Sequence, residues 1–558
     1  MGESTCPAYL VGKGVSDGGN ALFSIGNLMA VAMERCKTAR CAIQTMGDLG
    51  AKYGFYGEDP GFGGAGEAVT LVDRTGEAWV FHICGVGPNR QGINILEGCP
   101  AMPPHPGPDS AVLSGSPRDL LRVPSGHVAV IANSMIIRTV HLEDKENFMA
   151  HPGLEDLLKE SGLWNGASPL DWQRIVQPDL ATFSYFPGLA PIPMYSTLRM
   201  WGVYRQSSPS AGLQPTPDLG SFPFSVPVDG KATVQDVMNW FRTHYEGTEF
   251  DMRYGSLAGP WQSPNRAEGG NGAKAVPGQF ARSTSIGRTS YTQIVQTGPI
   301  HQPRVWFAAD TSASSVFVPF FASVLSDADG KFDVEAYGTG SQKSFAFSHH
   351  KGIGPAWWAF DTRSAVRYCL CGLTQEAERQ RGDRRTYRAN SLVNTGLGMF
   401  QFEPDFVANW MEVSYQNMSE QYVYPAVQST QLRVVRETEE ALHRADKMKA
   451  ASAAKHLAEH QSKIQRNVTE EWWALAEMLV VRYNDMFYNY PPETPHQVGS
   501  IGYPAFWLEM IGFNQEFYRQ SFPRASELAP PALQLVTAVA TPRQLVSQIR
   551  SQVSFLLF

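Results

Sequence analysis

The sequence predicts a mixed fold of α-helices and β-strands, the α+β class, with a large buried core. Short apolar runs separated by glycine and proline fill much of the first two thirds of the chain, a pattern typical of strands joined by turns. Apolar residues at helical spacing occur near the start, and a long charged stretch follows later. Of the 558 residues, 43% are hydrophobic and 18% are charged, as in a folded globular protein.

Two short helices and a hairpin are predicted first. Apolar residues recur at helical spacing between positions 25 and 33, and a second helix is predicted to start at Thr38. Residues 67–73 and 77–83 have the composition of strands and are joined by the turn Asp73-Arg-Thr-Gly76. The pattern therefore predicts a β-hairpin.

Further elements follow along the chain. Residues 127–133 are nearly all apolar, so we expect a strand buried on both faces of its sheet, with Asn133 at its end. Thr233 and Asp236 have the spacing of a capping box and open an amphipathic helix. Strands are expected at 291–296, 305–308 and 316–321, a long solvated helix at 431–466 and an aromatic helix at 470–483.

One segment interrupts this pattern. Residues 362–405 contain seven arginines and no lysine, which favours an insertion. Such an insertion could be disordered, or it could be untranslated sequence included by a faulty gene model. A natural surface loop is the alternative, and residues 84–118 raise the same question. We therefore expect a first domain over 1–361, the arginine-rich insertion, and a mostly helical remainder over 406–558.

Composition argues against several classes of protein. A net charge of -7 without a basic patch disfavours nucleic acid as a partner. No apolar run approaches the ~18 residues of a membrane span, and the compartment stays open. Seven cysteines without zinc-ribbon spacing predict no disulfide framework, and His349-His350 has no second ligand pair, so neither a metal nor a cofactor is expected.

Two short motifs match the residue spacing of known functional motifs but lack the secondary structure that those motifs require around them. Gly61-Phe-Gly63-Gly-Ala-Gly66 has the dinucleotide-binding spacing, but a loop precedes it and a strand is expected after it. Gly14-Val-Ser16-Asp-Gly18 has the spacing of a nucleophile elbow, yet it lies too early for a sheet to precede it. We interpret both as turns or loops.

A series of segments gives a more specific signal, because they occur in the order of one family. They are Gly2-Glu-Ser-Thr-Cys6, Met33-Glu-Arg-Cys-Lys-Thr-Ala39, Tyr53-Gly-Phe-Tyr56, Ala78-Trp-Val-Phe-His82, Val128-Ala-Val-Ile-Ala-Asn133, Arg199-Met-Trp-Gly202, Tyr245-Glu-Gly-Thr248 with Phe250-Asp-Met252, Arg288-Thr-Ser-Tyr291, Trp357-Trp-Ala-Phe360 and Ile501-Gly-Tyr-Pro504. Through them the chain resembles the dipeptidase A and secernin family of N-terminal-nucleophile cysteine peptidases. The resemblance implies an αββα sandwich, small peptide substrates and an amino-terminal cysteine nucleophile.

The resemblance also implies site residues. Asn133 matches an active-site asparagine that stabilises an oxyanion, and Arg288 matches a position that could bind the intermediate or the substrate carboxylate. A strand cap and a surface arginine are the structural alternatives. Cys6 would be the nucleophile if the segment after it is the mature amino terminus. The alignment that we favour instead sets Gly2 to Cys6 on an internal segment, so that the nucleophile and the first strands would lie upstream of Met1.

The leading hypothesis is therefore a cysteine-type dipeptidase. A non-catalytic secernin-like binding protein and an amidase for non-peptide amides are the alternatives.

Overall fold

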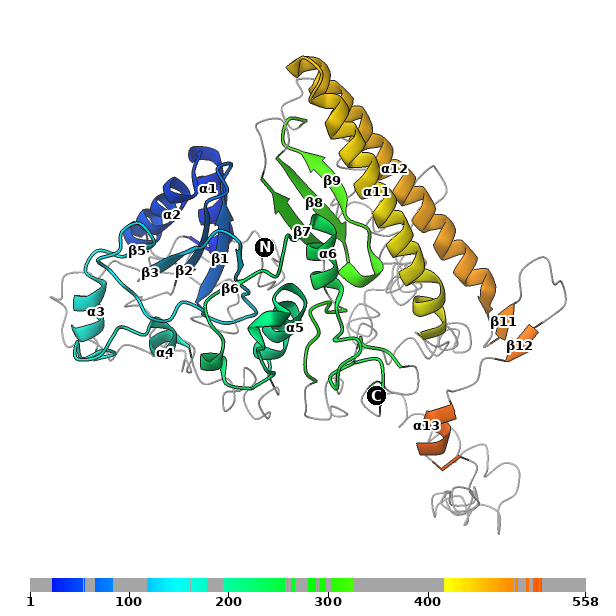
Figure 1. The fold of residues 1–558 in the computed structure, drawn as a ribbon, viewed down its shortest axis with the longest axis horizontal. Helices are drawn as coiled ribbons and strands as arrows, with labels where there is room; N and C mark the ends of the chain where they lie inside the picture. Colours follow the sequence, from blue (N-terminus) through cyan, green and yellow to red (C-terminus); the bar gives the residue numbers. More distant parts are fainter. Residues whose placement is uncertain are drawn as a thin grey trace, which may run out of the picture. The chain divides into compact units, whose positions relative to one another are not determined.

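The computed structural model confirms the α+β class: it combines helices with small antiparallel sheets (Figure 1). The chain divides into two compact units, of which one spans 1–258 and 262–501, and the other spans 259–261 and 502–558 and contains α13 (Ala505–Met510). Within the described residues, no helix is both long and apolar enough to cross a bilayer. The structure describes residues 23–53, 55, 66–83, 118–160, 162–177, 194–255, 258, 262–265, 280–287, 289, 291–297, 303–324, 416–484, 487–489, 498–500, 505–510 and 512–513.

The predicted first helices and hairpin are confirmed. The helices are α1 (Ile25–Arg35) and α2 (Ala39–Tyr53), and Thr38 accepts the Cys41 amide through its hydroxyl at 3.2 Å just before α2. Asp73 organises the hairpin turn, because its carboxylate accepts the amide of Thr75 at 2.8 Å. The hairpin belongs to a sheet of order β1-β2-β3-β5, formed by β1 (Glu67–Val72), β2 (Ala78–Ile83), β3 (Arg118–Val123) and β5 (Phe148–Ala150).

The two helices and the sheet share a core. Leu28 on α1 and Ile43 on α2 pack in one cluster with Trp79 and Phe81 of β2, and all four are fully buried. A disulfide joins Cys36, which follows α1, to Cys41 in α2. Its partners are five residues apart, so it closes a local loop rather than forming a framework of the kind that spacing rules detect.

The strand predicted at 127–133 is wrong in extent. Among the described residues of this run, only β4 (His127–Val128) pairs, with β6 (Val226–Pro227) in a two-stranded sheet. Side chains of other elements take over the backbone groups that follow, as when the phenol of Tyr204 accepts the Val130 amide at 3.2 Å. At Asn133 the backbone φ angle is positive, so the chain is no longer in the extended conformation of a strand. Nearby helices are α3 (Leu154–Glu160), α4 (Trp172–Val176) and α5 (Thr197–Ser207).

The predicted capping box is present at α6 (Val234–Arg242). Thr233 accepts the Asp236 amide at 3.3 Å, and the Asp236 carboxylate accepts the Thr233 amide at 2.8 Å. This reciprocal pair satisfies amides that a helix start otherwise leaves without acceptors. Met238, on the buried face of α6, packs in the hydrophobic cluster that also contains residues of the next sheet.

That sheet is an antiparallel meander covered by helices (Figure 1). The strands are β7 (Tyr291–Gln296), β8 (Arg304–Ala309) and β9 (Val318–Phe321), close to the predicted ranges. The covering helices include α11 (Tyr424–Ala445), which follows the π-helix Gln416–Val423, and α12 (Ala450–Arg482). Gln431 of α11 pairs with both backbone groups of Phe317, accepting its amide at 2.8 Å and donating to its carbonyl at 3.0 Å.

The predicted bounds of the two C-terminal helices are wrong. The break lies at 446–449, and α12 runs without interruption through 466–470. The high content of charged residues predicted solvated helices, but each helix has a buried apolar face. Val434 of α11 and Ile464 of α12 are fully buried against the sheet. A small sheet of β10 (Tyr483–Asn484), β11 (Phe487–Asn489) and β12 (Val498–Ser500) follows.

Candidate active site

Asn133 stands in the left-handed backbone region, with a φ of 52°. Asparagine enters this region more readily than other non-glycine residues, although such a conformation still costs on the order of 1–3 kcal/mol. Ser196, the residue before α5, holds it there by donating its hydroxyl to the Asn133 carbonyl at 3.2 Å. Strain that is maintained by surrounding contacts is common at functional sites.

Arg199 on α5 fixes the side chain of Asn133. Its Nη1 donates to Oδ1 of Asn133 at 3.0 Å, and its Nη2 donates to the carbonyl of Ala132 at 3.2 Å. Because a guanidinium has donors and no acceptor, the amide atom that faces Arg199 must be the oxygen. The Nδ2 group of Asn133, a hydrogen-bond donor, is therefore directed away from Arg199.

Two guanidinium groups meet at one tyrosine. Arg199 lies over the ring of Tyr195 at 5.1 Å and donates to the Tyr195 carbonyl from Nε and Nη2 at 3.2 and 3.1 Å. Arg282 lies over the same ring at 4.5 Å and donates to the phenol oxygen at 2.7 Å. Arg199 is only 8% exposed. A buried cation of this kind favours negative charge that develops beside it.

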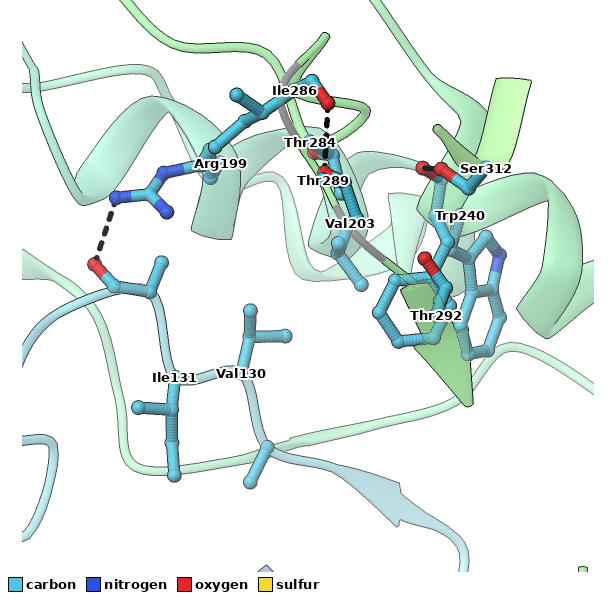
Figure 2. A pocket seen from close by; sticks show the side chains of 13 residues that line it. Val130, Ile131, Arg199, Val203, Trp240, Thr284, Ile286, Thr289, Thr292 and Ser312 are labelled. Atoms are coloured by element: carbon cyan, nitrogen blue, oxygen red, sulfur yellow. Dashed lines mark hydrogen bonds between the residues drawn. The ribbon is translucent and has the colours of Figure 1, made fainter. Parts of the chain in front are cut away.

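A cavity of about 90 Å³ adjoins these groups. Figure 2 shows Val130 pointing across it towards Val203, with Arg199 at one side and Thr292 and Trp240 at the other. Arg199 and Ala132 both line it, so Asn133 lies at its margin. The lining residues are Ala129, Val130, Ile131, Ala132, Arg199, Val203, Trp240, Phe241, Thr284, Ile286, Thr289, Thr292 and Ser312.

A close approach beneath α5 supports the site. A Cβ atom on Gly202 would lie 2.5 Å from Cε1 of Tyr245, so only glycine admits the ring at this place. Tyr245 is fully buried, has a φ of 65° and donates its hydroxyl to the carbonyl of Arg282 at 2.7 Å. The motifs containing Arg199 and Tyr245 thus pack against one another.

Two titratable groups near these elements have shifted pKa values. Complete burial lowers the pKa of His82 to about 3, so this histidine is neutral and serves in the core. Burial raises the pKa of Glu246, but hydrogen bonds and charge from His244 outweigh it and lower the pKa to about 2. Glu246 is therefore an ionised structural group, since it also accepts the His244 amide at 3.0 Å.

The structure places one of the three site residues expected from the sequence. Asn133 lies beside the cavity, whereas Cys6 and Arg288 lie outside the described residues, as do His349 and the 362–405 segment. In the described part of the chain, no group of three His, Cys, Asp or Glu side chains is arranged to hold a metal ion.

Sequence reasoning missed the role of Arg199. In the sequence, Arg199 is only the first residue of a family-like motif, because its partner Asn133 is 66 positions away and no local pattern links the two. The signal available was the presence of both residues in family-like segments.

Comparisons with known proteins agree on one family. The model of the family described as Peptidase family C69 matches residues 19–346. A probable dipeptidase of Latilactobacillus sakei is 24% identical over 130 residues, which is 23% of this chain and 25% of that protein. A probable dipeptidase of Salmonella dublin is 25% identical over 206 residues, 36% of this chain and 41% of that protein. The matches thus cover less than half the length of either relative.

Proposed function

This chain belongs to peptidase family C69, and from that membership we propose that it acts as a cysteine-type dipeptidase on small peptides. One observation supports the proposal above the others. The amide of Asn133 is held by Arg199, a buried guanidinium that lines a cavity together with Ala132, the residue before Asn133. Acyl transfer needs such a donor where the carbonyl oxygen becomes an oxyanion.

The proposed reaction has two steps. An amino-terminal thiolate attacks the peptide carbonyl and forms a C–S bond, while the oxygen takes the electron pair of the carbonyl double bond and accepts from Nδ2 of Asn133. The C–N bond then breaks, the leaving amine takes a proton from the α-ammonium group, and a thioester remains. Water then attacks the thioester with the α-amine as base and forms a C–O bond. The C–S bond breaks, the carboxylic acid leaves, and the sulfur takes a proton from the α-ammonium group to give the free thiol.

Arg199 is a positioning residue in this scheme. It keeps Oδ1 of Asn133 as the acceptor, so that Nδ2 faces the reacting carbonyl, and its charge favours the anionic intermediate. Truncating one such donor typically costs about 10²–10³ in kcat.

The nucleophile in this proposal is a cysteine that becomes the amino terminus of the mature protein. Cys6 is the candidate within this sequence, and Arg288 is proposed to contact the substrate carboxylate. An αββα sandwich and the division into 1–361, 362–405 and 406–558 remain parts of the same proposal.

The test is hydrolysis of a panel of dipeptides by protein purified from its native source, with its amino-terminal residue identified by intact mass and Edman sequencing. The proposal expects cleavage that is abolished by iodoacetamide and a mature chain beginning with cysteine. Binding of peptides without cleavage would support the secernin-like alternative. Cleavage of simple amides in preference to dipeptides would support the amidase.

A further inference from the structure

The cavity is lined mainly by apolar side chains, together with several that carry a hydroxyl group. Val130 and Val203 face one another across it, and the indole of Trp240 closes one side (Figure 2). Thr292 and Ser312 lie on the same side as Trp240 (Figure 2). The hydroxyl of Ser312 is already used, because it donates to the carbonyl of Phe241 at 2.6 Å.

The charge at this cavity has one sign. Arg199 is the charged group among the described residues that line it, and none of those residues is acidic. Arg199 directs its hydrogen bonds to Asn133, Ala132 and Tyr195, which are uncharged acceptors. An ammonium or guanidinium group entering here would lose its water and meet a cation, and both effects oppose binding.

The volume limits what can enter. A dry apolar cavity of about 150 Å³ accommodates benzene. The cavity here measures about 90 Å³ and is partly open, so it favours a short branched aliphatic side chain over an aromatic ring.

From these features we propose that the cavity is the specificity pocket for the side chain of the residue whose carbonyl is cleaved, and that it selects short uncharged aliphatic side chains over cationic and aromatic ones. The inference rests on the proposed peptidase function, because the carbonyl must lie at Asn133 for the adjoining side chain to enter the pocket. Val130 and Val203 set the size of the pocket, and Arg199 sets its charge preference.

The experiment compares the dipeptides Val-Gly, Lys-Gly, Phe-Gly and Gly-Gly on the full-length protein. Values of kcat/KM are measured where cleavage occurs, and calorimetric binding of the same dipeptides is measured where it does not. Val-Gly is expected to exceed both Lys-Gly and Phe-Gly by about tenfold or more, the discrimination that small changes in a hydrophobic pocket support.

Variants at Val130 test the pocket itself. Val130→Phe is expected to fill the cavity and to weaken Val-Gly about tenfold more than it weakens Gly-Gly. Val130→Ala is expected to raise the Phe-Gly value relative to Val-Gly. The matched control is Val295→Phe, because Val295 on β7 is 48% exposed and does not line the cavity.

The outcomes separate the two proposals. Cleavage or binding with equal preference for Val-Gly and Lys-Gly, or an unchanged preference in Val130→Phe, overturns the pocket while leaving the peptidase assignment intact. Absence of cleavage with the expected order of binding affinities overturns the peptidase function and, with it, the assignment of the pocket to a cleaved residue, while the side-chain selectivity of the cavity stands.

Discussion

Arg199 and Asn133 are joined by a hydrogen bond of 3.0 Å from Nη1 to Oδ1, which leaves the amide of Asn133 with one orientation. The same guanidinium donates to the carbonyls of Ala132 and Tyr195, so one side chain of α5 joins its own helix start to residues 66 and 67 positions upstream. The proposed oxyanion role of Asn133 rests on this orientation.

Replacing Arg199 by lysine should impair catalysis more than folding. Lysine keeps the charge but lacks the planar fork that reaches three acceptors, so the Asn133 amide loses its fixed orientation. We expect kcat/KM for a dipeptide to fall by about 100-fold, as small misplacements in active sites do. Arg205→Lys on the same helix is the control, because Arg205 is exposed. Equal activity of both variants would contradict the role given to Arg199.

Gly202→Ala should destabilise the protein although alanine favours helices. The new Cβ would meet the rigid ring of Tyr245 at 2.5 Å, and overpacking of this kind typically costs about 1–3 kcal/mol. Gly50→Ala is the matched control on α2, because its nearest neighbour at 2.9 Å is the flexible end of Ile83. Urea unfolding of both variants checks the difference, and an equal free energy of unfolding would rule out the packing argument.

Gln431→Leu should loosen α11 from the sheet. The change removes the partners of the Phe317 amide and carbonyl, and a buried backbone group without a partner costs about 1–3 kcal/mol. The thermal midpoint should fall, whereas Gln428→Leu, at an exposed position of the same helix, should leave it nearly unchanged. Similar midpoints for the two variants would mean that Gln431 does not hold this contact.

Glu246 should make stability depend on pH in the acid range. The folded pKa of about 2 lies below the ordinary value of 4.5, so the carboxylate stabilises the fold above about pH 4.5. That contribution is lost as the pH falls towards 2. The urea midpoint of Glu246→Gln should therefore depend less on pH between 5 and 3 than that of the unmodified protein. Glu249→Gln, at an exposed position, should retain the full dependence.

The sequence was most informative where structure is determined locally. The turn at Asp73 and the capping box of Thr233 and Asp236 depend on residues within three or four positions of each other, and both were predicted correctly. The strand predicted to end at Asn133 failed because its backbone bonds to side chains of α5 rather than to a neighbouring strand. Arg199 could not be assigned a role for the same reason, since its partners are set by tertiary packing.

The most direct measurement concerns Asn133→Asp. The carboxylate keeps the shape of the amide and should pair with Arg199, so the thermal midpoint should be retained or rise. It carries no donor for the oxyanion and adds negative charge, so kcat for dipeptide hydrolysis should fall by at least about 10²-fold. Full activity in a stable Asn133→Asp protein would contradict the proposed role of the Asn133 amide.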